Sequence, residues 1–303
     1  MARPEILPAT GLYATLRWGG SSRPARVGSG NPFAFSRRRP RLILLIPGYN
    51  VSESRAQGAL SHFEGNLQGI SARLAADVGW LVWRGDWGVP RLGGVAYPFK
   101  VAQTRQLGKL VADFIIELRR ESSQNREVVL VAHSLGCKLA LEAVECLRAA
   151  GVPGKGVKLF LMAAAVAIDE VDVAGRPLFL AARHPVQRGV LHSRSDLILR
   201  AMFRLGQAVA PDVPWWSGAV GVDGEPGSAW TFSEPMPGFG HSAYWGHRDS
   251  AEKFANFMGS PNASTGSPVR DIAHRTGPGA RDLPTMAPPV RRPGPWNGWT
   301  RGG

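Results

Sequence analysis

One nine-residue stretch, from Val129 to Cys137, restricts the possible folds more than any other part of the sequence. It reads VLVAHSLGC, which is an apolar strand pattern, then a serine, then the start of a helix pattern. A tight strand–serine–helix turn needs small residues two positions either side of the serine, and here they are Ala132 and Gly136. We expect Ser134 at the carboxyl end of its strand, beside a helix N-terminus that favours negative charge. The plainer alternative is a helix N-cap serine.

The rest of the middle of the chain alternates between short apolar runs and longer stretches with helical periodicity. Continuous apolar strands separated by helices are typical of a parallel sheet covered on both faces, so the predicted fold class is α/β. We expect strands at residues 41–47, 79–84, 127–132, 157–162, 189–192 and 229–232. We expect helices from about residue 54, across 107–118, at 135–149, at about 195–205 and at 247–258.

Two flanks differ in composition from this middle part. Residues 259–303 contain eight Gly and eight Pro without an apolar period, and we expect this segment to be disordered. Residues 1–41 are predicted to form a basic arm with a possible edge strand at 11–18, followed by a stretch at 19–40 that resembles the tail. The folded domain is therefore predicted to span residues 42–258.

The net charge of +13 also belongs to the flanks. Residues 1–41 hold eight Arg and one acidic residue, and residues 259–303 hold six Arg and two acidic residues. Residues 42–258 keep 22 basic and 20 acidic side chains. A folded nucleic-acid module would carry a basic face on its core, so no specific nucleic-acid partner is predicted. Basic tails are more typical of solubility or weak attraction to anionic surfaces.

No apolar run approaches the roughly 20 residues that a membrane-spanning helix needs, and no transmembrane segment is predicted. The N-terminus lacks the pattern of a secretory signal peptide. Cys137 and Cys146 are expected on one helix, about 13 Å apart, which is too far for a disulfide. These features favour a cytoplasmic location. The sequence predicts no oligomeric state.

A second candidate for the chemistry is the run from Pro47 through Gly48, Tyr49 and Asn50. A strand that ends in a glycine turn before a helix leaves backbone N–H groups free. We expect one of them, from Tyr49 or Asn50, to combine with the N–H of Leu135 as an oxyanion hole. The alternative is a plain glycine turn.

The serine turn, the upstream glycine loop and the strand–helix alternation together resemble the α/β-hydrolase superfamily. The run PGYNVS at residues 47–52 is similar to an uncharacterised bacterial serine-hydrolase branch, in which a His-Gly-aromatic-Asn segment precedes a helix. Pro47 stands where that branch has His. The resemblance covers about residues 42–258, and it implies a mostly parallel central sheet with helices on both faces. It also implies the chain order nucleophile, acid, histidine, with the two partners downstream of Ser134.

For the acid, Asp196 follows the expected strand at 189–192, where the superfamily usually places it. Its alternative role is to stabilise a helix N-terminus. Asp169 and Asp172, after the expected strand at 157–162, are the competing candidates.

For the base, His241 lies after the last expected strand and before the final helix, with small residues on each side. His247 is the competing candidate, and His133 is expected to point into the sheet. In this assignment His241 takes the proton of Ser134, and Asp196 orients the imidazole ring. The remaining histidines are expected to be packing or surface residues: His62, His184 and His192.

No cofactor is expected. The histidines and cysteines lack metal-ligand spacing, and the sequence contains neither a P-loop nor a dinucleotide fingerprint. Ten Trp residues are present, and several aromatics are expected above the carboxyl edge of the sheet, as an acyl-binding wall or as loop anchors. These aromatics are Trp87, Tyr97, Phe99, Trp215, Trp216 and Trp230.

The sequence therefore predicts a serine hydrolase of the esterase or lipase type, acting on a small-molecule acyl ester. One alternative is a non-catalytic scaffold that kept the fold, favoured by Pro47 and the long tails. Acyl transfer by the same residues is a second alternative, which differs in whether the pocket excludes water.

Overall fold

The computed structural model describes residues 13–17, 26–29, 40–48, 53–83, 93–121, 126–207, 217–224 and 229–260. The chain divides into two compact units, Met1–Gly266 and Ser267–Gly303, and the second lies wholly outside the described residues. The domain boundaries given above stay a prediction.

The first unit contains an eight-stranded sheet in the order β2-β1-β4-β3-β5-β6-β7-β8. Neighbouring strands are parallel except for β1 and β2, which are antiparallel. The predicted α/β class with a mostly parallel sheet is confirmed. The strands are β1 (Tyr13–Arg17), β2 (Arg26–Ser29), β3 (Arg41–Ile46), β4 (Val78–Trp83), β5 (Glu127–His133), β6 (Val157–Met162), β7 (Gln187–His192) and β8 (Phe232–Pro235).

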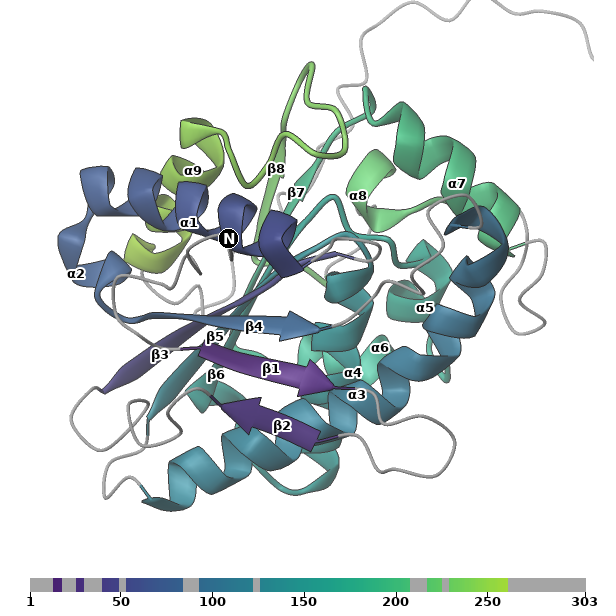
Figure 1. The fold of residues 1–303 in the computed structure, drawn as a ribbon. Coiled ribbons are helices and arrows are strands. Elements are labelled where there is room, and N and C mark those ends of the chain that lie inside the picture. Colours follow the sequence, from purple (N-terminus) through teal and green to yellow (C-terminus); the bar gives the residue numbers. More distant parts are fainter. Residues whose placement is uncertain are drawn as a thin grey trace, which may run out of the picture. The chain divides into compact units, whose positions relative to one another are not determined.

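Helices cover both faces of this sheet. In the described residues they are α1 (Glu53–Ile70), α2 (Ala72–Ala75), α3 (Gly93–Glu121), α4 (Leu135–Ala149), α5 (Ile168–Asp172), α6 (Phe179–Arg183), α7 (Leu197–Gln207), α8 (Val220–Asp223) and α9 (Arg248–Gly259), with a 3₁₀ turn at Gly154–Gly156. Side chains alternate across a strand, so Leu130 packs with α3 and α4 in one core while Val131 packs with α1 and α9 in another. Figure 1 shows α1 and α9 together on one face.

The centre of the sheet holds a topological switch point. From β3 the chain passes through α1 to β4 on one side, and from β5 it passes through α4 to β6 on the other side. Because α1 and α4 cover opposite faces, the two connections diverge between the carboxyl ends of β3 and β5, which is the position where open α/β sheets bind ligands. Gly48 follows β3 and Ser134 follows β5, so both lie at this switch point.

Three expectations about the first hundred residues were wrong in part. The strand predicted at 11–18 exists as β1, but it lies between β2 and β4 instead of at the edge. Residues 26–29 form the edge strand β2, where disorder was predicted; its sequence RVGS has no apolar alternation, and pairing with β1 is what orders it. Tyr97 and Phe99 lie inside α3 and not on a connection, because that helix begins at Gly93, well before its periodic apolar residues.

The other predicted strands and helices are confirmed, and apart from the earlier start of α3 their ends are shifted by at most three residues. The short helices α2, α5, α6 and α8 were not predicted, since four or five residues are too few to show a helical period. Cys137 and Cys146 are free thiols on α4, as expected. No helix in the described part of the chain is long and apolar enough to cross a membrane.

Candidate active site

Ser134 occupies a sharp turn between β5 and α4. Its backbone has φ 55° and ψ −128°, a conformation that costs a residue with a side chain about 1–3 kcal/mol. Its N–H donates to the carbonyl of Met162 at 3.0 Å, and its carbonyl accepts from the N–H of Ala165 at 3.2 Å. Strain of this kind persists only where the surroundings fix it, and it clusters at functional sites.

The turn is packed so tightly that its neighbours must be small. A Cβ atom on Gly136 would lie 2.4 Å from the carbonyl oxygen of Pro47, and one on Gly48 would lie 2.8 Å from the Cβ of Ser134. Ala132, in the position before the turn, is fully buried. Pro47 and Gly48 therefore lie directly against the serine turn.

The structure brings Ser134, His241 and Asp196 into one hydrogen-bonded line. The Nε2 of His241 lies 2.9 Å from the Oγ of Ser134, and its Nδ1 lies 2.7 Å from the Oδ2 of Asp196. Ser134 follows β5, Asp196 follows β7, and His241 lies in the connection between β8 and α9. Residues more than one hundred positions apart therefore meet because parallel strands end at the same sheet edge.

Asp196 is fully buried and yet bonded at both carboxylate oxygens. Its Oδ1 accepts the N–H of Leu199 at 2.8 Å, in the first turn of α7, while its Oδ2 faces His241. A buried carboxylate needs such partners to offset the loss of water. Asp196 thus makes both of the contacts considered for it. Oδ1 bonds to the N-terminus of α7, and Oδ2 bonds to His241.

The competing candidates have other partners. Asp172 pairs with Arg183 at 3.2 Å, and the N–H of Asp169 donates to the Oγ of Ser217. His247 is the N-cap of α9, where it accepts the N–H of Asp249. Across the residues that the structure describes, no three His, Cys, Asp or Glu side chains group closely enough to hold a metal ion.

The predicted oxyanion donors are described only in part. Leu135 is the first residue of α4, so its N–H has no partner within the helix. Tyr49 and Asn50 lie outside the described residues, as do Trp87, Trp215 and Trp216.

Trp230 is on the wrong edge for a substrate wall. It lies two residues before β8, and the neighbouring Thr231 N–H donates to the carbonyl of Arg188 near the start of β7. Because β7 and β8 are parallel, their starts lie at the edge opposite to Ser134. The expectation for Trp230 was therefore wrong: it packs against the core on the α3–α4 face.

His133 is a residue at the site whose part the sequence did not indicate. It is buried, with 7% of its surface exposed, and its ring centroid lies 5.0 Å from that of His241. Its Nε2 lies 2.7 Å from the carbonyl oxygen of His241. Burial first, and next the neighbouring His241, lower the pKa of His133 from 6.5 to about 3. The strand pattern predicts that His133 is buried. It does not predict the contact with the carbonyl of His241, which lies 108 positions away in the sequence.

This pKa makes His133 a source of acid sensitivity. Below pH 6.5 the unfolded chain binds a proton there that the folded chain does not, so stability falls as the pH drops towards 3. We expect the loss in unfolding free energy between pH 7 and pH 4.5 to be about 3 kcal/mol smaller in His133→Gln than in the parent protein. Urea unfolding at the two pH values measures it. Equal losses in the two proteins would contradict a buried, neutral His133.

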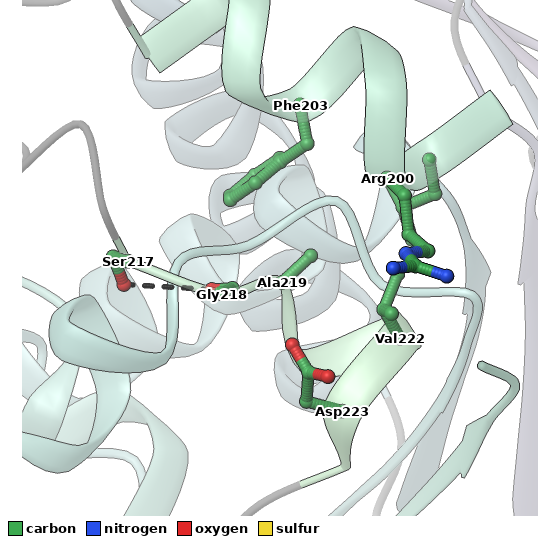
Figure 2. A pocket seen from close by; sticks show the side chains of 8 residues that line it. Arg200, Phe203, Ser217, Gly218, Ala219, Val222 and Asp223 are labelled. Atoms are coloured by element: carbon green, nitrogen blue, oxygen red, sulfur yellow. Dashed lines mark hydrogen bonds between the residues drawn. The ribbon is translucent and has the colours of Figure 1, made fainter. Parts of the chain in front are cut away.

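A small pocket of about 80 Å³ lies beside the acid's helix, between α7 and α8 (Figure 2). Its lining is apolar at Leu199, Phe203 and Val222, with Arg200 and Asp223 at the polar end. Leu199 connects the pocket to the site, because it lines the pocket and its backbone N–H donates to Asp196. Neither Ser134 nor His241 lines it, so the pocket borders the site without containing the reactive atoms.

Part of the chain matches a known protein family. The family model described as serine hydrolase matches residues 96–199, which include Ser134 and Asp196. A phospholipase A1 from Dinoponera quadriceps is 28% identical over 89 residues, covering 27% of this chain and 24% of the relative. The match thus spans about a quarter of that relative's length.

Two solved structures are similar to this chain at low sequence identity. An esterase from Pyrobaculum calidifontis is 15% identical, covers 73% of this chain and 74% of its own, and has a TM-score of 0.37. The RedJ thioesterase of the prodiginine biosynthetic pathway in Streptomyces coelicolor is 15% identical, covers 75% of this chain and 87% of its own, and also has a TM-score of 0.37. In its strand order, its central switch point and its strained serine turn the chain resembles the α/β-hydrolase superfamily, and its residues 96–199 match the family model described as serine hydrolase.

Proposed function

We propose that this protein hydrolyses carboxylic esters, with Ser134 as nucleophile, His241 as general base and Asp196 as the residue that orients the base. The observation that carries the proposal is the continuous line of hydrogen bonds from the Ser134 Oγ through the imidazole of His241 to the buried Asp196 carboxylate. A scaffold has no use for this line, because a fully buried carboxylate and a strained serine both cost stability.

The steps follow from the two hydrogen bonds. The Nδ1–H of His241 donates a hydrogen bond to the Asp196 carboxylate and keeps its proton, which leaves the Nε2 lone pair facing the serine hydroxyl. As the Ser134 Oγ forms a bond to the acyl carbon, its proton passes to Nε2, and the imidazolium then gives that proton to the departing alcohol. A water molecule repeats the sequence on the acyl-enzyme, releasing the acid and restoring Ser134.

Developing negative charge on the acyl oxygen needs donors in place beforehand. The N–H of Leu135 suits this role because α4 leaves it unused and the helix N-terminus adds its dipole. We propose the N–H of Tyr49 or Asn50 as the second donor, since Gly48 lies against the serine turn.

The family match supports the reaction class, and the name of the phospholipase A1 relative is compatible with an acyl ester as substrate. We propose a small-molecule acyl ester, without a cofactor. A cytoplasmic location stays a prediction from the sequence.

A fluorophosphonate probe tests the proposal without knowledge of the substrate, because it reacts with serines that a neighbouring base activates. We expect the probe to label the full-length protein at Ser134, as read by peptide mass spectrometry. Labelling should disappear in Ser134→Ala and in His241→Ala. His247→Ala is the matched control, since that histidine caps α9 and packs against the Phe239 ring, and its loss should leave labelling unchanged.

Two results would contradict the proposal. One is an unlabelled protein whose circular dichroism and melting curve show that it is folded. The other is labelling that persists in His241→Ala, which would mean that Ser134 is not activated by this histidine.

A further inference from the structure

The histidine of the site lies on a segment without regular structure. Residues 236–247 connect β8 to α9 through consecutive turns. A base on such a segment must be fixed by specific contacts, since a displacement of about 1 Å can cost about 10²-fold in rate. Side chains from three other parts of the chain bond to its backbone carbonyls: Ser193 to Phe239 at 2.8 Å, His133 to His241 at 2.7 Å and Asn66 to Gly246 at 3.1 Å.

Among these bonds, the one from His133 reaches the base itself. A backbone carbonyl accepts and does not donate, so the Nε2 of His133 must carry the proton and act as the donor. The ring of His133 also packs against Tyr244 and Trp245, with centroid separations of 5.9 and 6.0 Å. The segment 236–247 therefore both accepts the hydrogen bond from His133 and packs against the His133 ring.

The hydrogen bond from His133 completes a closed loop of bonds around the Ser134 Oγ and the His241 Nε2. His133 and Ser134 are covalent neighbours, His133 bonds to the backbone of His241, and the imidazole of His241 returns to the Ser134 Oγ at 2.9 Å. This loop consists of His133, Ser134 and His241, and it does not include Asp196. The acid therefore controls the rotation of the imidazole, whereas His133 controls the position of the backbone from which the imidazole extends.

We propose that His133 is a positioning residue, which sets the distance between the base His241 and the nucleophile Ser134 by donating its Nε2–H to the backbone carbonyl of His241. Strand alternation gives it the right direction, because His133 continues the series of Val129 and Val131 towards the α1–α9 face. A neutral imidazole is required there, since a second positive charge would oppose the imidazolium that His241 becomes during the reaction. The lowered pKa of His133 meets this requirement.

This inference rests on the proposed function, and two substitutions separate the donor from the ring. His133→Phe keeps an aromatic ring but has no N–H, whereas His133→Gln keeps an amide N–H that can bond to the same carbonyl. With a chromogenic phenyl ester as substrate, we expect His133→Phe to lower kcat by about 10–100-fold with KM changed by less than about twofold. His133→Gln should restore kcat to within about fivefold of the parent protein. The rate constant of fluorophosphonate labelling should follow kcat.

His184→Phe is the matched control, because it removes a bond of the same kind, from the Nε2 of a histidine to the backbone carbonyl of Val152 at 2.9 Å, on a segment that does not carry the base. It should leave kcat within about twofold. An unchanged kcat in a folded His133→Phe protein overturns the inference, and so does a loss in His133→Gln as large as that in His133→Phe, because the donor would then be irrelevant. If the parent protein itself fails to label, the proposed function fails and this inference with it.

Discussion

Ser134→Ala should lower kcat/KM towards a chromogenic carboxylic ester by about 10⁴–10⁶-fold, because it removes the oxygen that lies 2.9 Å from the Nε2 of His241 and acts as the proposed nucleophile. The residual rate should be that of water attack helped by the oxyanion donors alone. Steady-state kinetics with active-site-titrated parent protein measures the change. A loss of less than tenfold would show that another residue carries the reaction.

The same position offers a control on protein integrity. Alanine shares the strain that serine experiences at φ 55°, whereas glycine adopts this conformation freely. Ser134→Gly should therefore be as inactive as Ser134→Ala but more stable, by about 1 kcal/mol in the free energy of unfolding. If Ser134→Gly is inactive although it is more stable than Ser134→Ala, the loss of activity comes from the missing hydroxyl and not from unfolding. A glycine variant less stable than the alanine variant would mean that the turn holds no strain.

The sequence predicts the central fold well because its signals are local. The apolar runs of β3, β5 and β6 are continuous, and the helix after β5 has a clear period, so each element is specified by its own residues. Strand β2 depends instead on its partner β1, and the short helix α8 depends on backbone contacts with the segment after β6. Neither contact leaves a pattern in a window of a few residues.

At the site, the places of three residues along the chain could be predicted from recognisable elements: Ser134 and Asp196 directly precede α4 and α7, and His241 lies in the connection between β8 and α9. The contact between His133 and the carbonyl of His241 could not, since a carbonyl has no residue identity. Trp230 shows the converse error: a large aromatic residue near the predicted acid and base in the sequence lies at the opposite edge, because the strand it precedes is parallel to its neighbour.

Asp196→Asn should lower kcat/KM by about 10⁴-fold while the protein stays folded. The backbone N–H of Leu199 sets the orientation of the new amide. Only the amide oxygen can accept this N–H, so the oxygen takes the position of Oδ1. The amide NH₂ must then face the Nδ1 of His241, which has to accept instead of donate. The imidazole proton moves to Nε2, and His241 can no longer take the proton of Ser134. Asparagine caps helices as well as aspartate does, so α7 keeps its first turn.

Asp172→Asn and Asp169→Asn are the matched controls, because these were the competing acids and their contacts lie elsewhere. Both should retain kcat/KM to within about twofold, with kinetics and melting temperatures measured side by side for the three variants. A large loss in either control, together with activity in Asp196→Asn, would reassign the acid. Activity in all three would mean that the bond between His241 and Asp196 does not control the histidine tautomer, and the base would then need another explanation for its orientation.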